Sequence, residues 1–526
     1  SRTVRIVQQD EHGLLVEETL GRIGGETIDE YDALPVALTP GSPPPAGAQQ
    51  GAIEAWGQRL RAALDRAAPE RAAGLTEPGT PHAPAAAWPN DAVADLLRRR
   101  PPRLRSGRAP VAVDSAEALA SGGGEDARLI GAVTESLLAL EHSYLAVQGP
   151  PGTGKTYLAS RVIRALVERH GWRIGVVAQS HRVVENVLSG VVAAGLDPDR
   201  VGKVAQRGRE AEPADYTVLS SNGQAAFARD REPGGYVLGG TAWDFANEKR
   251  FARGQLDLLV VDEAAQFSLA PTIAASAAAE RLLLLGDPQQ LPQVSQGAHP
   301  EPVDESALGW LVDGAEVLPA ALGYFLAESR RMRPEVTGPV SELSYGGRLR
   351  AHPAAAERAL DGHAPGVSTH LVEHRGNATF SPEEAAEVVR IVRSVVGSVW
   401  HPGGGRAARP ATPADVIVVA PYNAQVECIA EALAAAGLGE VPVGTVDKFQ
   451  GQEAAVAILS TAASSPAEVP RGMEFLLMRN RLNVAISRAQ VAAHVVTSAF
   501  LTEMLPASPQ AMADLSAFLR LTGRSR

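Results

Sequence analysis

The sequence predicts an α/β protein in which two parallel-sheet domains follow one another, preceded by a small region of strands and a helix. Two observations lead to this fold class. Segments 256–261 and 416–420 are apolar at nearly every position and only strand-long, which is typical of strands covered on both faces. Such strands alternate with amphipathic helical segments in two stretches, one beginning near residue 125 and the other after about residue 365.

Composition excludes several classes of protein. Of the 526 residues, 45% are hydrophobic and 21% are charged, which is the balance of a folded, water-soluble chain. No apolar run reaches the length of a membrane span, and no signal peptide opens the sequence, so no membrane partner is expected. The single cysteine, Cys428, excludes an internal disulfide or multi-cysteine metal site and favours a cytoplasmic protein. A start at Ser-Arg-Thr is compatible with a fragment of a longer protein.

The charge balance restricts how nucleic acid could bind. The formal net charge is −11, so a nucleic-acid surface would have to be locally positive. The basic residues are almost all arginines, and the lysines are Lys155, Lys203, Lys249 and Lys448. A lysine inside a motif is therefore an informative residue in this chain.

Residues 1–75 are predicted to form an accessory region, a partial β-barrel with a stalk helix. Alternating apolar residues in TVRIV and LLVEET, on either side of DEHG, predict a hairpin, and residues 52–73 have the spacing of an amphipathic helix. Residues 76–124 are predicted to be a linker with a basic connector. Within it, residues 98–108 hold six arginines that could contact phosphates or form a solvated connector, and the interspersed prolines favour the connector.

The first sheet domain is predicted over residues 125–326 and the second over residues 327–526, with an inserted subdomain at 197–236. The first domain is expected to contain helix 126–140, strand 143–148, helix 156–169, strand 173–178, helix 182–194, strand 256–261, helix 269–279 and strand 281–286. The second is expected to contain strand 369–374, helix 382–397, strand 416–420, helix 424–436, strands 443–446 and 456–460, helix 475–487 and strand 494–498.

A glycine-rich segment between the first strand and the next helix predicts a phosphate-binding P-loop. It reads Gly149, Pro150, Pro151, Gly152, Thr153, Gly154, Lys155 and Thr156. Glycines allow successive backbone N–H groups to point at phosphates, and the start of a helix adds partial positive charge. Lys155 is expected to reach the β- and γ-phosphates of a nucleotide, and the hydroxyl of Thr156 to bind Mg²⁺.

Two further strand ends carry candidate residues for nucleotide hydrolysis. Strand 256–261 leads into Asp262, a candidate Mg²⁺ ligand, and Glu263, a candidate base that orients the attacking water. In isolation the pair would equally suit a strand end with a helix cap, but a P-loop upstream favours the catalytic interpretation. Gln290, in the loop after strand 281–286, is a candidate sensor of the γ-phosphate.

Six segments occur in the order found in superfamily 1 helicases: GPPGTGKT, VVDEAAQ, GDPQQLP, RRMRPEVTGPVSELSYGGRL, VGTVDKFQGQE and RLNVAISRAQ. More narrowly, residues 145–500 resemble the 1B branch, which contains the nonsense-mediated-decay helicase, senataxin and the replication-associated nuclease-helicase. The chain is also similar to the C-terminal motor of bacterial RecB-like nuclease–helicase fusions. The resemblance implies two tandem RecA-like P-loop domains that hydrolyse ATP with Mg²⁺.

The resemblance also implies roles for individual residues. Gln290 matches the γ-phosphate sensor, Arg331 an arginine offered to the γ-phosphate, Glu453 a residue that contacts the ribose or couples it to domain closure, and Arg488 the arginine finger. Arg481 and Arg488 are seven positions apart, which would place them on one face of the predicted helix 475–487. Helix-end charge compensation is the alternative interpretation of Arg488.

Two positions depart from the family pattern. Arg330 stands where the family has an aromatic residue that stacks on adenine. A guanidinium can also stack, so Arg330 remains a nucleotide-binding candidate, and weaker selectivity for the base is expected. Arg333 replaces the usual histidine.

Candidate nucleic-acid contacts come from two strand-end segments in each domain. The resemblance places them at Ser180, His181, Asn186 and Thr241 in the first domain and at Tyr422, Asn423, Thr445 and Lys448 in the second. Ser180 and Thr241 suit helix or turn caps equally well. Contacts of this kind would position a strand without reading its sequence.

These observations predict an ATP-dependent translocase, or helicase, that moves on single-stranded DNA or RNA. The family implies movement from 5′ to 3′. Both candidate arginines lie in the same chain as the P-loop, so a monomer could complete its own site. The alternative is a non-unwinding, ATP-gated clamp, or a regulatory module of a larger nuclease-helicase. None of the lysines lies in a (D/E)-x-K arrangement, so a nuclease would have to be an attached domain or a partner.

Overall fold

The computed structural model describes residues 4–10, 13–18, 22–23, 26–27, 46–72, 88–105, 107, 109–115, 124–206, 213–293, 299–506 and 508–523. By its contacts the chain divides into two compact units, Ser1–Gly47 and Ala48–Arg526. The predicted accessory region extended to residue 75, whereas the helix that follows residue 46 lies almost entirely within the larger unit. No helix in the described ranges is long and apolar enough to cross a membrane.

The smaller unit contains two hairpins. Strands β1 (Val4–Asp10) and β2 (Gly13–Glu18) pair antiparallel, as the alternating sequence predicted, with a register shift between Ile6 and Gln8. Two shorter strands, β3 (Arg22–Ile23) and β4 (Glu26–Thr27), also pair antiparallel.

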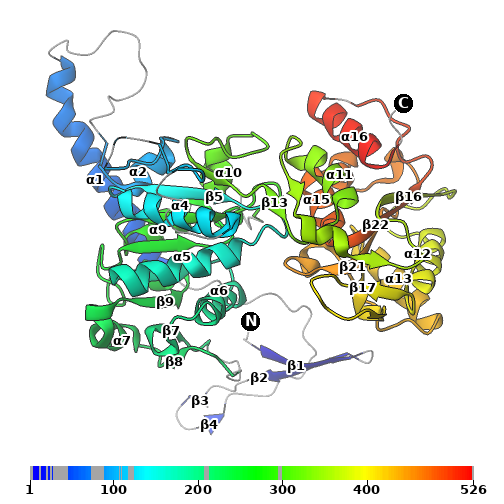
Figure 1. The fold of residues 1–526 in the computed structure, drawn as a ribbon, viewed down its shortest axis with the longest axis horizontal. Helices are drawn as coiled ribbons and strands as arrows, with labels where there is room; N and C mark the ends of the chain where they lie inside the picture. The colour runs from blue at the N-terminus through cyan, green and yellow to red at the C-terminus, as the bar shows by residue number, and fades with distance from the viewer. Residues whose placement is uncertain are drawn as a thin grey trace. The chain divides into compact units, whose positions relative to one another are not determined.

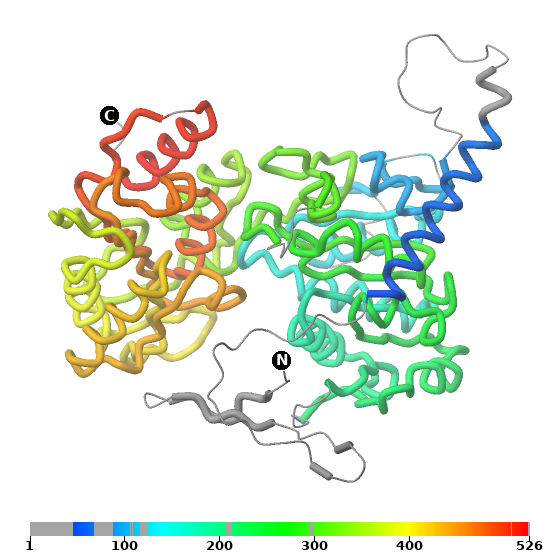
Figure 2. The backbone as a smooth tube through the Cα atoms, turned by 180° about the vertical axis from the view of Figure 1, so that it is seen from behind, coloured from blue at the N-terminus to red at the C-terminus, as the bar shows by residue number. Residues whose placement is uncertain are grey.

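Helix α1 (Gly47–Ala72) is anchored through its early turns. Trp56 is buried against Val93 and Ala94, and its indole N–H donates to the carboxylate of Asp91 at 3.1 Å. Figure 2 shows the early turns of α1 beside the first domain and its later turns extending away. One aromatic residue therefore fixes one end of a long helix.

The arginine-rich connector is attached to the first domain rather than solvated. Arg99 donates to the carbonyl of Trp310 at 2.6 Å and forms an ion pair with Asp313 at 2.9 Å. Arg103 pairs with the buried Asp95 at 2.7 Å. The prediction of a free connector is wrong for these two residues, and neither guanidinium is available to bind phosphates without breaking an ion pair.

The first domain is an eight-stranded parallel sheet with helices on both faces, in the order β12-β5-β11-β10-β6-β9-β7-β8 (Figure 1). Its strands are β5 (Tyr144–Gln148), β6 (Arg173–Val177), β7 (Val201–Val204), β8 (Thr217–Leu219), β9 (Tyr236–Gly240), β10 (Leu258–Val261), β11 (Leu282–Gly286) and β12 (Gly323–Phe325). Its helices are α2 (Ala92–Leu97), α4 (Glu125–Ala139), α5 (Lys155–His170), α6 (His181–Ala193), α7 (Gln224–Arg231), α8 (Ala242–Phe245), α9 (Leu269–Ser276) and α10 (Ala307–Val312).

Alternate residues of the buried strands point to opposite faces and form two hydrophobic clusters. On β5, Leu145 and Val147 pack with α4, α5 and α6, whereas Tyr144 and Ala146 pack with α2, α8, α9 and α10. All four of these β5 side chains are fully buried. Continuous apolar strands arise from this two-sided burial, which is why the sequence predicted a parallel sheet.

Residues 197–236 differ from the prediction of an inserted subdomain. The described part of this segment contains β7, β8 and α7, and β7 pairs in parallel with β9, so the segment extends the sheet by two edge strands. Lys203, on β7, is buried and paired with Glu185 at 2.9 Å. Strands β7 and β8 are only four and three residues long, too short to give a clear strand pattern in the sequence.

The second domain contains a five-stranded parallel sheet in the order β16-β22-β21-β19-β20. Its strands are β16 (Gly366–Val372), β19 (Val416–Val419), β20 (Val443–Gly444), β21 (Ala454–Ser460) and β22 (Ala489–Ser498). The short strands β13 (Glu328–Ser329), β14 (Arg350–Ala351), β15 (Ala359–Leu360), β17 (Val399–His401) and β18 (Arg409–Pro410) form two small sheets beside it. The helices are α11 (Pro334–Ser344), α12 (Pro382–Val395), α13 (Asn423–Ala435), α14 (Met473–Leu477), α15 (Arg479–Ile486) and α16 (Pro509–Leu521).

The predicted helix 475–487 is two helices. Met478 has a non-helical backbone, with φ −51° and ψ 117°, which ends α14 and precedes α15. Helix α15 ends at Ile486, so Arg488 lies beyond it, and Arg481 and Arg488 do not share a helical face. Apolar spacing alone does not reveal a break at one residue.

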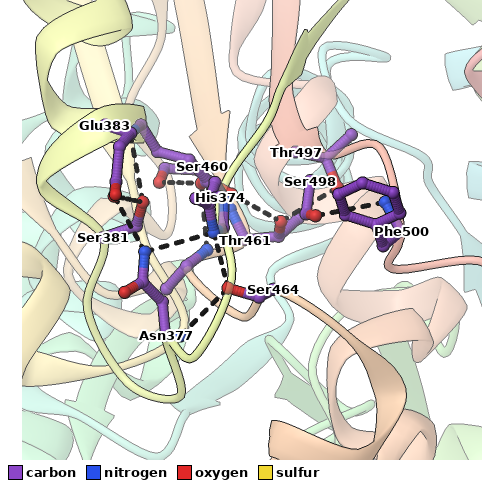
Figure 3. A network of polar contacts seen from close by, with 12 residues as sticks. His374, Asn377, Ser381, Glu383, Ser460, Thr461, Ser464, Thr497, Ser498 and Phe500 are labelled. Atoms are coloured by element: carbon purple, nitrogen blue, oxygen red, sulfur yellow. Dashed lines mark hydrogen bonds and ion pairs between the residues drawn. The ribbon is translucent and has the colours of Figure 1, made fainter.

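A buried carboxylate organises the carboxyl edge of the second sheet. The Oε2 atom of Glu384 accepts hydrogen bonds from the hydroxyl of Ser460 at 2.6 Å and from the backbone N–H groups of Thr461 and Ala462 at 2.9 Å. Its Oε1 atom lies 3.1 Å from Nε2 of His374, and both side chains are fully buried. Figure 3 shows His374 beside Asn377 and Ser464 in the same network. One side chain thus fixes the loop that follows β21.

We predict that Glu384→Ala lowers the free energy of unfolding by about 3–5 kcal/mol, because several buried donors lose their acceptor together. Urea unfolding measures the change. Glu431→Ala, at an exposed position on α13, is the control and should alter stability by no more than about 0.5 kcal/mol. A similar small effect for Glu384→Ala would contradict an organising role for this carboxylate.

Candidate ATP site between the two sheet domains

The P-loop connects β5 to α5, as the sequence predicted. Gly152 and Gly154 have φ of +74° and +82°, backbone conformations that favour glycine. Nζ of Lys155 donates to the carbonyl of Gly149 at 2.7 Å, so the ammonium lies directly over the loop. A β-carbon on Gly149 would lie 2.3 Å from Cγ of Lys155, so a larger residue at this position would displace the lysine side chain.

The P-loop also contacts the beginning of the second domain. The hydroxyl of Ser329 donates to the carbonyl of Pro151 at 2.9 Å, and the backbone N–H of Arg330 donates to the carbonyl of Gly152 at 2.8 Å. A β-carbon on Gly152 would lie 2.4 Å from Cβ of Arg331. The loop is therefore held between α5 and the segment that precedes α11.

Asp262 and Glu263 follow β10 at the carboxyl edge of the first sheet. Asp262 is buried, and its Oδ1 atom accepts from the N–H of Glu263 at 2.9 Å. Burial, with the neighbouring carboxylate of Glu263, raises the pKa of Asp262 above its ordinary value, while Lys155 opposes that rise. Glu263 has a φ of +52°, a strained conformation of the kind found at functional sites.

Gln290 belongs to a hydrogen-bonded chain that crosses between the domains. Its Nε2 donates to Oδ2 of Asp287 at 3.0 Å, and the same oxygen accepts from the hydroxyl of Tyr345 at 2.7 Å. Asn483 donates to the oxygen of Tyr345 and to the carbonyl of Gln289, each at 2.8 Å. Sequence reasoning missed Asp287, Tyr345 and Asn483, although all three lie inside the motifs that carry the family resemblance.

Arg331 and Glu453 form an ion pair on the second-domain side of the cleft. Nε of Arg331 lies 2.7 Å from Oε2 of Glu453, and Nη1 donates to the carbonyl of Ser487 at 3.1 Å. Oε1 of Glu453 accepts from Gln490 at 2.7 Å. Burial acts to raise the pKa of Glu453, but Arg331 and Gln490 outweigh it and the pKa lies below its ordinary value. The structure shows Glu453 as the partner of Arg331, and its expected contact with a ribose remains a prediction.

Arg488 is an almost fully buried guanidinium, with 2% of its surface exposed. It donates to the carbonyls of Val484 and Gln452 at 2.9 and 3.1 Å, and it forms no ion pair with a carboxylate in the described parts of the chain. Burial, with help from the charge of Arg331, lowers the pKa of Arg488 to about 9, while Glu263 acts in the opposite direction. A buried cation held only by carbonyls would be stabilised by an anion in the cleft.

The two arginines that depart from the family pattern have structural partners. Nη2 of Arg330 makes a forked contact with both carboxylate oxygens of Asp126, at 2.8 and 2.9 Å. Arg330 and Asp126 line a pocket together with Tyr157 and His352, beside the start of α5. Arg330 can therefore border a nucleotide base there, but its guanidinium is already engaged. Arg333 pairs with Glu335 and donates to two main-chain carbonyls, and so fixes the loop after β14.

The first-domain nucleic-acid candidates lie at the ends of β6 and β9, which are adjacent strands. Ser180 caps α6 through the N–H of Val183, and the hydroxyl of Thr241 caps α8 by bonding to Asp244. Both residues therefore have the capping role that the sequence left open. Asn186 is exposed. Nδ1 of His181 is buried without a hydrogen-bond partner, and burial, with Lys203, lowers the pKa of this histidine.

The second-domain candidates lie at the ends of β19 and β20, which also pair. Asn423 is the first residue of α13 and is exposed. Thr445 precedes a short 3₁₀ turn that contains Lys448, whose side chain is exposed and donates to the carbonyl of Val443 at 2.8 Å. Tyr422 is half-buried and stacks on Phe475. The structure thus brings these candidates to one edge of the second sheet.

The residues present suit a Mg²⁺–nucleotide complex. Asp262 is a buried carboxylate whose charged form would be favoured by a divalent cation, and Thr156 follows Lys155 in the first turn of α5. No cluster of three or more histidine, cysteine or acidic side chains suited to a metal occurs in the described ranges. The two predicted ligands would therefore hold a cation that arrives with the nucleotide.

Comparison with known proteins agrees with this architecture. Two AAA domain models match the chain, one over residues 131–307 and the other over residues 318–499. The helicase/nuclease DNA2 of Gallus gallus is 25% identical over 356 residues, which is 67% of this chain and 34% of that protein. The DNA-binding protein SMUBP-2 of Rattus norvegicus is 26% identical over 415 residues, 65% of this chain and 40% of that protein. The chain thus spans about a third of the length of the first and two fifths of the second.

A solved structure of the Arterivirus helicase nonstructural protein 10 with DNA covers 71% of this chain, and this chain covers 62% of it, at a TM-score of 0.38 and 16% identity. The two AAA domain matches, the DNA2 and SMUBP-2 relatives and the six ordered motifs all support the resemblance of this chain to superfamily 1B helicases.

We predict that Gly152→Ala lowers ATP turnover at least about tenfold, because a β-carbon would be strained at this φ and would collide with Arg331. The steady-state ATPase rate measures the loss. Gly254→Ala is the matched control, since Gly254 has a φ of +64° with nothing within 4 Å of an added β-carbon. Equal loss in both variants would mean that strain, rather than the contact with Arg331, is responsible.

Tyr345→Phe should lower kcat with little change in KM. The substitution removes the hydroxyl that bonds to Asp287, so Gln290, which also bonds to Asp287, is no longer linked to the second domain. We expect the free energy of unfolding to fall by about 1–3 kcal/mol as well. Tyr324→Phe is the control: its hydroxyl is also buried, beside Ser136 and the carbonyl of Ala132, but lies outside this chain of bonds. Unchanged kcat in Tyr345→Phe would contradict a positioning role.

Proposed function

We propose that the chain hydrolyses ATP between its two sheet domains and uses the cycle to move along a single strand of nucleic acid. The observation that carries this proposal is the charge arrangement of the cleft. Arg331 and Arg488 meet there, and Glu453 is the one carboxylate paired with either of them in the described parts of the chain. The triphosphate of ATP supplies the missing negative charge.

The two sides of the cleft would perform different parts of the reaction. On the first-domain side, the P-loop amides and Lys155 bind the phosphates and Glu263 orients the attacking water. On the second-domain side, Arg331 and Arg488 stabilise negative charge on the transferred phosphoryl group. Mg²⁺, held by Thr156 and Asp262, would neutralise charge on the phosphate oxygens.

The same charges would drive the movement of the domains. With the γ-phosphate bound, both arginines are attracted toward the P-loop side of the cleft. After phosphate departs, Arg331 and Arg488 are left facing each other with only Glu453 ion-paired to either of them in the described parts of the chain, and the closed arrangement loses its main electrostatic stabilisation. The chain of bonds from Gln290 through Asp287 to Tyr345 would transmit the change to the second domain.

The strand would lie along the carboxyl edges of the two sheets. His181 and Asn186 are the more available contacts in the first domain, and Tyr422, Asn423 and Lys448 in the second. We propose movement from 5′ to 3′, as the family resemblance implies, by a monomer in the cytoplasm. DNA as the polymer is supported by the names of both relatives, and RNA is the alternative outcome of the test. An attached or partner nuclease is supported by the name of the helicase/nuclease relative.

The experiment is the steady-state ATPase rate without polymer, with single-stranded DNA and with single-stranded RNA, at fixed low salt. We expect strong stimulation by at least one polymer. Arg488→Ala should lower the stimulated rate by about 10³-fold or more while nucleotide affinity changes little. Lys155→Ala should abolish turnover, and Glu263→Gln should stop hydrolysis yet retain binding of ATP and of the strand.

Lys249→Ala, at an exposed lysine away from these motifs, is the matched control and should turn over at the parental rate. A parental rate indifferent to both polymers would contradict the translocase and favour an ATP-gated module. Stimulation without strand separation on a tailed duplex would identify a clamp or translocase that does not unwind.

A further inference from the structure

An aromatic–arginine cluster at the carboxyl edge of the second sheet has no part in the ATP site. The ring of Phe475, on α14, stacks on Tyr422 with centroids 5.6 Å apart and planes at 29°. The guanidinium of Arg481 lies 4.1 Å from the centroid of Phe475, and that of Arg471 lies 4.9 Å from it. We call these four residues the Phe475 cluster.

The cluster lies beside the ends of three neighbouring strands. Phe475 and Arg481 line a small pocket together with Pro421 after β19, Val446 after β20 and Thr461 after β21. Thr461 belongs to the loop that Glu384 fixes, so one wall of the pocket is rigid. Asn423 and Lys448, two of the candidate strand contacts, follow the same strand ends.

Two polar groups in the cluster lack partners. The hydroxyl of Tyr422 and the Nε of Arg481 are buried atoms without a hydrogen-bond partner. Buried donors in folded proteins are almost always paired, so two such atoms in one cluster indicate that a ligand completes it. Arg471, by contrast, is exposed, and its guanidinium lies over the ring of Phe475.

We propose that the Phe475 cluster binds one nucleotide of a single-stranded nucleic acid, with the base stacked on the aromatic pair and the adjoining phosphate paired with Arg471. A base is a stronger partner for an aromatic ring than an exposed guanidinium is, so an arriving base displaces Arg471 to the backbone phosphate. Tyr422 and Arg481 then donate to the nucleotide. This inference rests on the proposed function and extends its strand contacts to Phe475, Arg471 and Arg481.

Stacking of a base on Phe475 and pairing of a phosphate with an arginine can be distinguished by experiment. Binding should depend on the presence of bases and tolerate any base, since each has a π-face. Removing the ring should therefore weaken binding only to strands that carry bases. Removing the charge of Arg471 should weaken binding to all strands equally and reduce its salt dependence.

The test measures binding by fluorescence anisotropy to oligo-dT, to oligo-U and to a DNA strand of the same length without bases. We expect Phe475→Leu to weaken binding to base-bearing strands by at least about fivefold and to leave the abasic strand unaffected. Phe475→Trp should retain parental binding. Arg471→Gln should weaken all strands equally and lower the slope of log affinity against log salt by about one. Whichever of oligo-dT and oligo-U binds with higher affinity identifies the preferred polymer as DNA or RNA.

Phe227→Leu is the matched control, because Phe227 also lies against an arginine, Arg231, but on α7 at the other sheet. Urea midpoints of each variant monitor folding, and photo-crosslinking of an iodouracil strand to the parental chain, mapped by peptide, tests the contact without a substitution. The stacking site would be overturned if Phe475→Leu weakened binding to base-bearing and abasic strands equally, or if it did not weaken binding at all. The absence of a crosslink at residues 422 and 475 would also overturn it. Absence of parental binding to every strand would instead contradict the proposed function.

Discussion

The placement of Arg488 is the constraint on which the ATP site depends. A guanidinium with 2% of its surface exposed is costly unless its donors and its charge are both compensated. Main-chain carbonyls compensate the donors, but Glu453 is already paired with Arg331. In the described parts of the chain, Arg488 therefore presents to the P-loop side a positive charge that no carboxylate pairs directly and that Glu263 and Glu453 offset only in part. As proposed above, this arrangement would gain stability from a bound polyphosphate and lose it when the phosphate leaves, which is what a motor that alternates between two states requires.

The fold and the first half of the site could be predicted because their signals are local. Lys155 stands in a glycine-rich turn between a strand and a helix, and Asp262 directly follows a buried strand, so a short window of sequence carries each prediction. Tyr345 and Asn483 could not be found in this way, since their roles depend on contacts with Asp287 and Gln289 across long separations in the chain. Only the folded arrangement brings these residues together.

Other differences have similarly specific causes. The break at Met478 changes one backbone conformation without changing the apolar pattern, so the sequence predicts one continuous helix where the structure has two. Strands β7 and β8 are only four and three residues long, so they give no clear strand pattern, and the segment resembled an insertion in the sequence. The prolines within 98–108 favoured a solvated connector, and the sequence did not reveal that Arg99 and Arg103 have partners outside this segment, at Asp313 and Asp95.

The contacts of Ser329 and Arg330 with the carbonyls of Pro151 and Gly152 have a mechanical consequence. They place the junction of the two domains against the nucleotide-binding loop, so a rotation of one domain about this junction would have its axis close to the phosphates. Atoms near an axis move little, whereas atoms at a distance sweep a long arc. A sub-ångström adjustment around the γ-phosphate would then become a displacement several times larger at a bound strand, in proportion to the ratio of the two radii. The step length would be set by the distance between the axis and the strand, and not by the size of the chemical change.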